Sequence, residues 1–158
     1  MKFCLPENYK IVEAITPQAG AAITGDYVSM KNAHRAFVLA HINQAAANTV
    51  AITIEQAQAV ANTGSKAITV AVPIWADEDC AASDTLVRQT DAVAFTTSAA
   101  QKHKLVIFQI DAATLNDANG FDCITVKTGA SSASNITSAM YVLETRYPGA
   151  TPPSAIVD

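Results

Sequence analysis

The sequence predicts an all-β protein, an antiparallel β-sandwich or jelly roll with extended termini. Its apolar residues fall into about eight short segments of strand length, many of them alternating with polar residues. Turn-forming residues separate these segments at intervals of roughly ten to fifteen residues. An open α/β sheet would need long helical crossovers, and no segment shows a sustained amphipathic helical period.

The length and composition predict one domain that contacts other subunits. The 158 residues fit a single β-sandwich domain over 1–158, with an N-terminal arm of about 1–25 and a C-terminal tail of about 147–158. Charged residues make up 15% of the chain, which is below the roughly 25% of an average soluble protein. Such a low charge suggests surface that is buried against other subunits.

The segment 104–111 is expected to be the central strand. Its apolar side chains occupy both alternating sets, so neither face is suited to water. The two sets are Leu105 and Ile107 on one side, and Val106, Phe108 and Ile110 on the other. Charged residues, with Lys104 at the start and Asp111 at the end, limit the strand to about the average length.

Before this strand, the chain predicts an arm and two early strands. Residues 1–25 show no sustained period and hold two prolines and two glycines, so only short pairing segments are expected there. A short strand is expected at 27–30. Residues 35–43 carry apolar residues in both alternating sets, which predicts a largely buried strand.

A hairpin is expected next. Residues 50–55 alternate between apolar and polar and predict a half-buried strand, although helix formers leave a helix over 54–61 as the alternative. The turn at 62–66 has residues that tolerate positive φ. Residues 67–75 then predict antiparallel strand segments that are broken at Pro73.

The second half of the chain predicts four more strands and one helical turn. The strands are expected at 85–89, 92–97, 123–128 and 139–145. A single helical turn is expected at 111–116, with the Asp111 side chain as its N-cap. The tail is rich in proline, which favours extended backbone.

No catalytic, cofactor-binding or metal-binding residues are predicted. His34, His41 and His103 lie in or beside predicted strands, where packing or surface placement explains them better than catalysis does. No Gly-x-Ser-x-Gly turn presents a serine nucleophile. An enzyme therefore remains only an alternative.

Two acidic segments are expected to be solvated rather than to bind an ion. Carboxylate oxygens are the ligands that calcium prefers, so both segments are candidates for such a site. They contain Asp77, Glu78, Asp79 and Asp84 in the first, and Asp117, Asn119 and Asp122 in the second. The spacing of a calcium-binding loop is absent from the second segment.

Charge and cysteine content argue against several classes of partner. The net charge of −4, with scattered basic residues, argues against nucleic-acid binding. Pro6 and Glu7 interrupt the start of the chain, so neither a signal peptide nor a membrane span is expected there. Cys4, Cys80 and Cys123 are expected to be buried free thiols, because they lack metal-ligand spacing and their odd number favours a reducing compartment.

Trp75 is the single tryptophan, and it follows Pro73 and Ile74. An exposed tryptophan could stack on a sugar ring, which would make the domain a carbohydrate-binding sandwich. Packing in the core is the favoured interpretation.

Three blocks of sequence resemble those of small virion proteins of tailed bacteriophages. The blocks are Thr53-Ile54-Glu55-Gln56-Ala57 with Gly64-Ser65-Lys66-Ala67-Ile68, Phe121-Asp122-Cys123-Ile124-Thr125-Val126-Lys127, and Arg146-Tyr147-Pro148-Gly149 with Pro152-Pro153-Ser154-Ala155-Ile156. The resemblance extends over most of the chain. It implies a head protein, most like a capsid decoration (cement) protein.

The resemblance also implies partners and a location. Such proteins bind the major capsid protein on the outside of the capsid, assemble in the bacterial host cytoplasm, and commonly form dimers or trimers. They have no catalytic residues or cofactors to carry over. A tail-tube or head–tail adaptor protein remains the alternative within a virion.

The two predicted extended termini carry apolar side chains that need a surface to bury against. These candidate contacts are Phe3, Leu5, Tyr9, Ile11, Tyr147 and Ile156. The surface is expected to be an adjacent subunit or the capsid shell, with the chain's own sandwich as the alternative.

Overall fold

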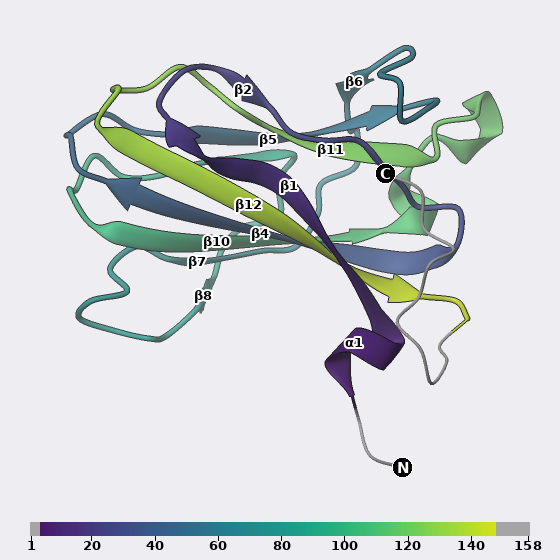
Figure 1. Cartoon of the computed structure of the whole chain (residues 1–158), viewed down its shortest axis with the longest axis horizontal. Helices are drawn as coiled ribbons and strands as arrows, with labels where there is room; N and C mark the ends of the chain where they lie inside the picture. Colours follow the sequence, from purple (N-terminus) through teal and green to yellow (C-terminus); the bar gives the residue numbers. More distant parts are fainter. Residues whose placement is uncertain (1–3, 148–158) are drawn as a thin grey trace.

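The computed structural model describes residues 4–147, and they form two antiparallel sheets that pack face to face (Figure 1). Sheet A contains β1 (Tyr9–Ala19), β4 (Ala33–Gln44), β7 (Ile74–Asp77), β8 (Val87–Arg88), β10 (His103–Asp111) and β12 (Asn135–Thr145). Sheet B contains β2 (Ile23–Thr24), β3 (Val28–Ser29), β5 (Ala51–Ala57), β6 (Lys66–Ala67), β9 (Ala94–Thr96) and β11 (Cys123–Thr128). The all-β sandwich prediction is confirmed.

The strand order shows how often the chain changes sheet. Sheet A has the order β1-β12-β4-β10-β7-β8, and sheet B has the order β2-β11-β5-β6, with β3 paired to β11 and β9 paired to β5. Most connections therefore pass from one sheet to the other, as in jelly rolls. Buried apolar residues of both sheets, including Phe108, Ile54 and Val126, form a continuous core between them.

Helix is confined to short segments. They are α1 (Leu5–Asn8) and the 3₁₀ turns η1 (Ala112–Thr114) and η2 (Asp117–Asn119). None of the described helices is long and apolar enough to cross a membrane. The predicted turn near 111–116 is present, but the Asp111 side chain does not cap it. Instead, Asp111 lies 3.5 Å from the Arg35 guanidinium, because Asp111 and Arg35 are directly paired across β10 and β4.

The predicted central strand, β10, lies between β4 and β7. Val106, Phe108 and Ile110 are fully buried in the core, as expected. Leu105 and Ile107, however, are only half-buried on the opposite face. The prediction that both faces are buried is therefore wrong for the described residues, because no second layer lies on that side of sheet A.

Lys104 also differs from its expected place as a charged strand end. Its side chain points into the sandwich and has an exposed fraction of 0%. The amine donates hydrogen bonds to Ser98 O at 2.7 Å and to Ser98 Oγ at 2.9 Å. Burial lowers the pKa of Lys104, while the nearby Glu78 carboxylate opposes that shift. Polar partners at the edge of the core therefore make this burial tolerable.

Much of the predicted N-terminal arm is a strand of the domain. β1 pairs with β12 along its length and buries Val12, Ala14 and Ile15 in the core. Register shifts occur on both sides of Ile15. Pro17 is tolerated because β1 is an edge strand, where a missing amide donor can face solvent.

The predicted hairpin is present as β5 and β6. β5 runs to Ala57 as a strand, so the alternative helix over 54–61 does not form. Glu55 pairs with Ala67, and the turn between the strands contains Asn62 and Gly64 at positive φ. The turn chemistry was therefore predicted correctly.

All three cysteines are free, as predicted, but only Cys123 is buried. Cys4 and Cys80 are partly exposed. Burial, together with a hydrogen bond to the Asp122 carboxylate, raises the pKa of the Cys123 thiol to about 12. Cys123 is therefore a protonated, packed side chain at neutral pH.

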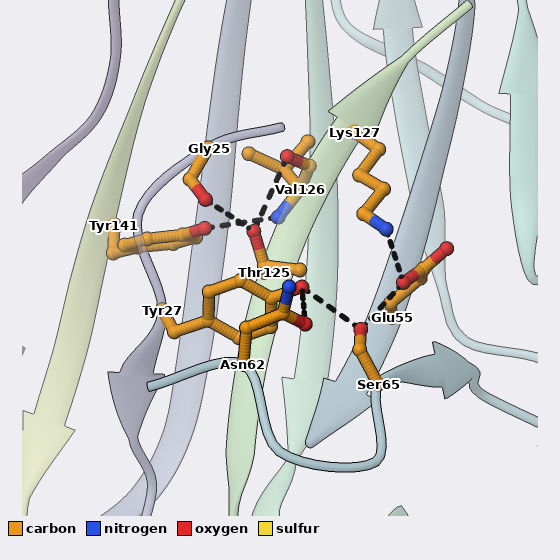
Figure 2. Close-up of polar contacts among 9 residues, drawn as sticks. All are labelled: Gly25, Tyr27, Glu55, Asn62, Ser65, Thr125, Val126, Lys127 and Tyr141. Carbon is orange, nitrogen blue, oxygen red and sulfur yellow. Dashed lines mark hydrogen bonds and ion pairs between the residues drawn. The ribbon is translucent and has the colours of Figure 1, made fainter. Parts of the chain in front are cut away.

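Tyr141 connects the two sheets at the point where one edge of sheet B is interrupted. β2 and β3 both pair with β11, but the chain between them leaves the ladder at Gly25 and Asp26. The Tyr141 side chain reaches across the core from β12, and its hydroxyl accepts a hydrogen bond from the Val126 amide at 2.9 Å (Figure 2). The same hydroxyl donates to Asp26 O at 2.8 Å.

Gly25 is required beside this contact. A Cβ atom on Gly25 would lie 2.8 Å from Ala14 O and 2.9 Å from Val126 O, so any side chain would displace the backbone. The close approach lets the Gly25 amide donate to Val126 O and its carbonyl accept from Thr125 Oγ1. The interrupted edge of sheet B is thus closed by Tyr141 and by this segment.

The substitution Tyr141→Phe is expected to lower the free energy of unfolding by about 1–3 kcal/mol, because it leaves the buried Val126 amide and Asp26 carbonyl without this partner. Urea denaturation measures the change. The control is Tyr147→Phe, at a tyrosine that is 73% exposed, which should alter stability by less than about 0.5 kcal/mol. Equal stability of Tyr141→Phe and the unsubstituted protein would show that the bridge contributes nothing.

Candidate interaction surface

The outer face of sheet A carries one row of side chains that runs across all six strands. Consecutive cross-strand pairs define this central row, which holds Glu13, Met140, Leu39, Ile107, Trp75 and Arg88 in that order. Directly paired residues of antiparallel strands point to the same face, so these side chains are neighbours. The row is apolar in the middle and charged at its two ends.

The rows on either side extend the apolar surface. One holds Ile11, Val142, Phe37 and Gln109, and the other holds Ser138, His41, Leu105 and Asp77. Together the apolar members form the outer-face patch, defined as Ile11, Phe37, Leu39, Trp75, Leu105, Ile107, Met140 and Val142. Met140 is 50% exposed and Ile11 is 44% exposed. A continuous apolar patch of this kind marks an interaction site more often than single exposed apolar residues do.

Polar groups border the patch along the strand direction. At one end, the Arg35 guanidinium lies 3.0 Å from Glu144 and 3.5 Å from Asp111. Near the other end, the rings of His41 and His103 stack with their centroids 6.2 Å apart. An apolar centre with a polar rim is the usual arrangement of a protein–protein interface.

Trp75 belongs to this surface and not to the core, so the expectation that it packs in the core is wrong. Ile74 and Ala76 take the inward positions of β7, and the two-residue period of a strand turns Trp75 outward. Its ring is half-buried, with the Arg88 guanidinium 4.9 Å from the ring centroid. Trp75 also lines a shallow pocket together with Phe37, Leu86, Ile107 and Gln109.

The outer face of sheet B has a different character, because the β5–β6 turn covers part of it. Below that turn, Tyr27, Ala57, Cys123 and Val60 form a small apolar cluster. The Tyr27 hydroxyl lies 2.7 Å from Asn62 Oδ1 and 2.9 Å from Ser65 Oγ (Figure 2). The turn is therefore fastened to sheet B by polar contacts.

Glu55 continues this set of polar contacts across the sheet. Its Oε2 atom accepts from Ser65 Oγ at 2.6 Å and from Lys127 Nζ at 2.7 Å. Burial raises the pKa of Glu55, but hydrogen bonds from Lys127 and Ser65 and the charge of Lys127 outweigh it, so the net pKa is lowered. The carboxylate is ionised and engaged, which leaves sheet B with a polar outer face.

The predicted terminal contact residues fall into two places. Leu5, 43% exposed, and Tyr147, 73% exposed, flank the region where α1 meets the end of β12, since Thr145 Oγ1 donates to Asn8 O at 3.2 Å. Ile11 instead belongs to the outer-face patch, and Tyr9 is half-buried beside it in β1. Phe3 and Ile156 lie outside the described residues.

The first acidic segment is less solvated than expected, because most of its carboxylates have local partners. Asp77 accepts a hydrogen bond from the Asp79 amide, and Glu78 accepts one from the Ser98 amide. Asp79 forms an ion pair with Lys102, and hydrogen bonding to Lys102 lowers the pKa of Asp79 despite an opposing effect of burial. Asp84 remains exposed. These carboxylates therefore serve mainly in local structure.

The second acidic segment and His34 lie at the surface or form local contacts. Asp122 lies 3.6 Å from Lys31, Asn119 bonds to Asn116, and Asp117 and His34 are exposed. Within residues 4–147, no three or more His, Cys, Asp or Glu residues are grouped so that they could hold a metal ion.

The outer-face patch was missed by the sequence analysis, although a signal for it was present. Apolar residues in both alternating sets of 35–43 and 104–111 indicated that two faces avoid water. The pattern was interpreted as burial inside one domain. The same pattern of apolar residues fits equally well a strand that has one face in the core and the other face in an uncovered patch.

Comparisons with known proteins support the fold. No family model matches the chain, and no curated protein matches it. The structure is similar to the crystal structure of the SPBc2 prophage-derived protein YomS, with a TM-score of 0.50 and 10% sequence identity, over 85% of this chain and 92% of that chain. At this level of identity the likeness concerns the fold alone.

The Glu55 contacts predict a specific loss of stability in acid. Because the folded pKa of Glu55 is lowered, its contribution is present above the unfolded pKa near 4.5 and is lost as pH falls through the folded pKa. Glu55→Gln is therefore expected to lower the free energy of unfolding at pH 7 by about 1 kcal/mol and to reduce its decline below pH ~4.5.

Urea denaturation at pH 7 and pH 3 measures this effect. The matched control is Asp84→Asn, because Asp84 is exposed and makes no ion pair among the described residues. A decline in acid that is as steep for Glu55→Gln as for the unsubstituted protein would contradict the role of this carboxylate.

Proposed function

We propose that the protein is a structural component of a phage virion, and more specifically a decoration protein that binds the major capsid protein on the outside of the capsid. The observation that carries this proposal is the placement of apolar side chains on an extended sheet face and beside the termini, where they suit contacts with large partners. The prophage origin of the structurally similar protein YomS supports a phage role.

The terminal region is the proposed capsid contact. Leu5 and Tyr147 are exposed there. In the sequence, Phe3 precedes Leu5 and Ile156 follows Tyr147. Each such side chain, when fully buried against the shell, contributes about 1.5–3 kcal/mol before the cost of ordering the chain. Binding to the assembled lattice in preference to free subunits then stabilises the capsid by mass action.

A tail-tube or head–tail adaptor protein is the alternative within a virion, since either would use the same kind of subunit contacts. A carbohydrate-binding role has less support. Arg88 lies over the Trp75 ring, and the pocket beside it offers few polar groups for sugar hydroxyls. We propose a non-catalytic function.

Cosedimentation with capsids tests the decoration role. Capsids from a phage that lacks the gene for this protein are mixed with the purified chain. The full chain is expected to bind saturably, and deletion of residues 148–158 is expected to weaken binding at least ~10-fold, because the tail's apolar contacts are lost. Far-ultraviolet circular dichroism should be unchanged.

The substitution Tyr147→Ala is a finer version of this experiment, with an expected loss of roughly 10-fold in affinity. Val70→Ala, at an apolar residue that is 46% exposed in the β6–β7 connection, is the matched control and should bind normally. Absence of capsid binding by the full chain, with recovery of the protein in tails, would reject the decoration role in favour of the alternative.

A further inference from the structure

The central row of sheet A is complementary to itself when its order is reversed. It runs from Glu13 through the apolar residues to Arg88. We propose that the outer-face patch packs against the same patch of a second copy of this chain, related by a two-fold axis that runs parallel to the strands between β4 and β10. This inference does not depend on the virion role.

The two-fold axis sets specific residues opposite each other. Rotation by half a turn sets β1 opposite β8 of the second copy, β12 opposite its β7, and β4 opposite its β10. In the central row, Leu39 then faces Ile107 of the other copy, and Met140 faces its Trp75. An isologous interface of this kind repeats each contact twice.

Charges also match under this operation. Glu13 is exposed and makes no ion pair among residues 4–147, and it comes to lie opposite Arg88 of the other copy. The Arg88 side chain is 43% exposed and also pairs with Asp91 of its own chain, so Glu13 would be a second carboxylate for this guanidinium. In the row at the polar end of the patch, Arg35 comes to lie opposite Asp111. Neither pairing brings like charges together, and such complementarity favours one register over others.

The size of the face suits a stable dimer. Six strands at ~4.8 Å spacing and the nine residues from Ile136 to Glu144 bound a face of roughly 24 by 27 Å. Its projected area is at most about 650 Å², because β7 and β8 are shorter than the other strands. A standard interface buries about 800 Å² of accessible surface per partner, which is more than the projected area because side chains add relief. The strands of the two copies would also be aligned, as in face-to-face packing of sheets.

A second copy explains the row better than other occupants do. A capsid or the chain's own tail could cover apolar residues, but neither requires opposite charges at the two ends of one row. Self-association makes use of them, because each end meets the oppositely charged end of the other copy. The pattern of Glu13, four apolar residues and Arg88 is therefore best explained by a homodimer.

Sedimentation velocity tests the proposal. The full chain is expected to sediment as a dimer at about 50 µM. Interfaces of this size have dissociation constants that are micromolar at the weakest, so this concentration is high enough for association. Met140→Lys places a charge opposite Trp75 and is expected to weaken the dimer at least ~10-fold. Val70→Lys, at a comparably exposed apolar residue outside the sheets, is the matched control and should remain dimeric.

A charge exchange tests the two-fold arrangement. Glu13→Lys and Arg88→Glu should each weaken the dimer, and the double variant should restore it, with circular dichroism confirming the fold of each. A monomeric or trimeric full chain, a dimer that is insensitive to Met140→Lys, or a double variant that fails to reassociate would overturn the proposal. Dimerisation that appears only after residues 148–158 are deleted would instead assign the face to the tail.

Discussion

The hydrogen bonds of the Tyr141 hydroxyl hold the two sheets in one relation to each other. They join β12 of sheet A to the Val126 amide and the Asp26 carbonyl, where the edge of sheet B is interrupted. With Tyr141 turned inward, the two-residue period of the strand turns Met140 and Val142 outward. A buried polar contact thereby decides which apolar residues form the outer-face patch.

The outer faces of the two sheets differ in what covers them. On sheet B, a turn covers a small apolar cluster and is fastened by Tyr27, Asn62 and Ser65 (Figure 2). On sheet A, no described segment covers the corresponding face. A stable protein that leaves one sheet face apolar while closing the other has a surface suited to contact with another protein.

The sequence predicted the sandwich, the centre of sheet A and the β5–β6 turn because each depends on local pattern or turn chemistry. It failed for Lys104, which was expected only as a charged end of its strand and is buried, and for Trp75, which was expected in the core and lies on the outer face. Alternation gives two faces but does not say which face meets the core. That choice depends on partners distant in sequence, such as Ser98 for the Lys104 amine.

Electron cryomicroscopy of the phage particle that carries this protein tests most directly whether it decorates the capsid as a self-associated sandwich. The expected map shows copies on the outside of the capsid lattice, joined in pairs through the outer faces of sheet A, with Leu5 and Tyr147 directed toward the shell. Density for the chain in the tail, or single copies bound to the shell through Met140 and Leu39, would contradict this assignment.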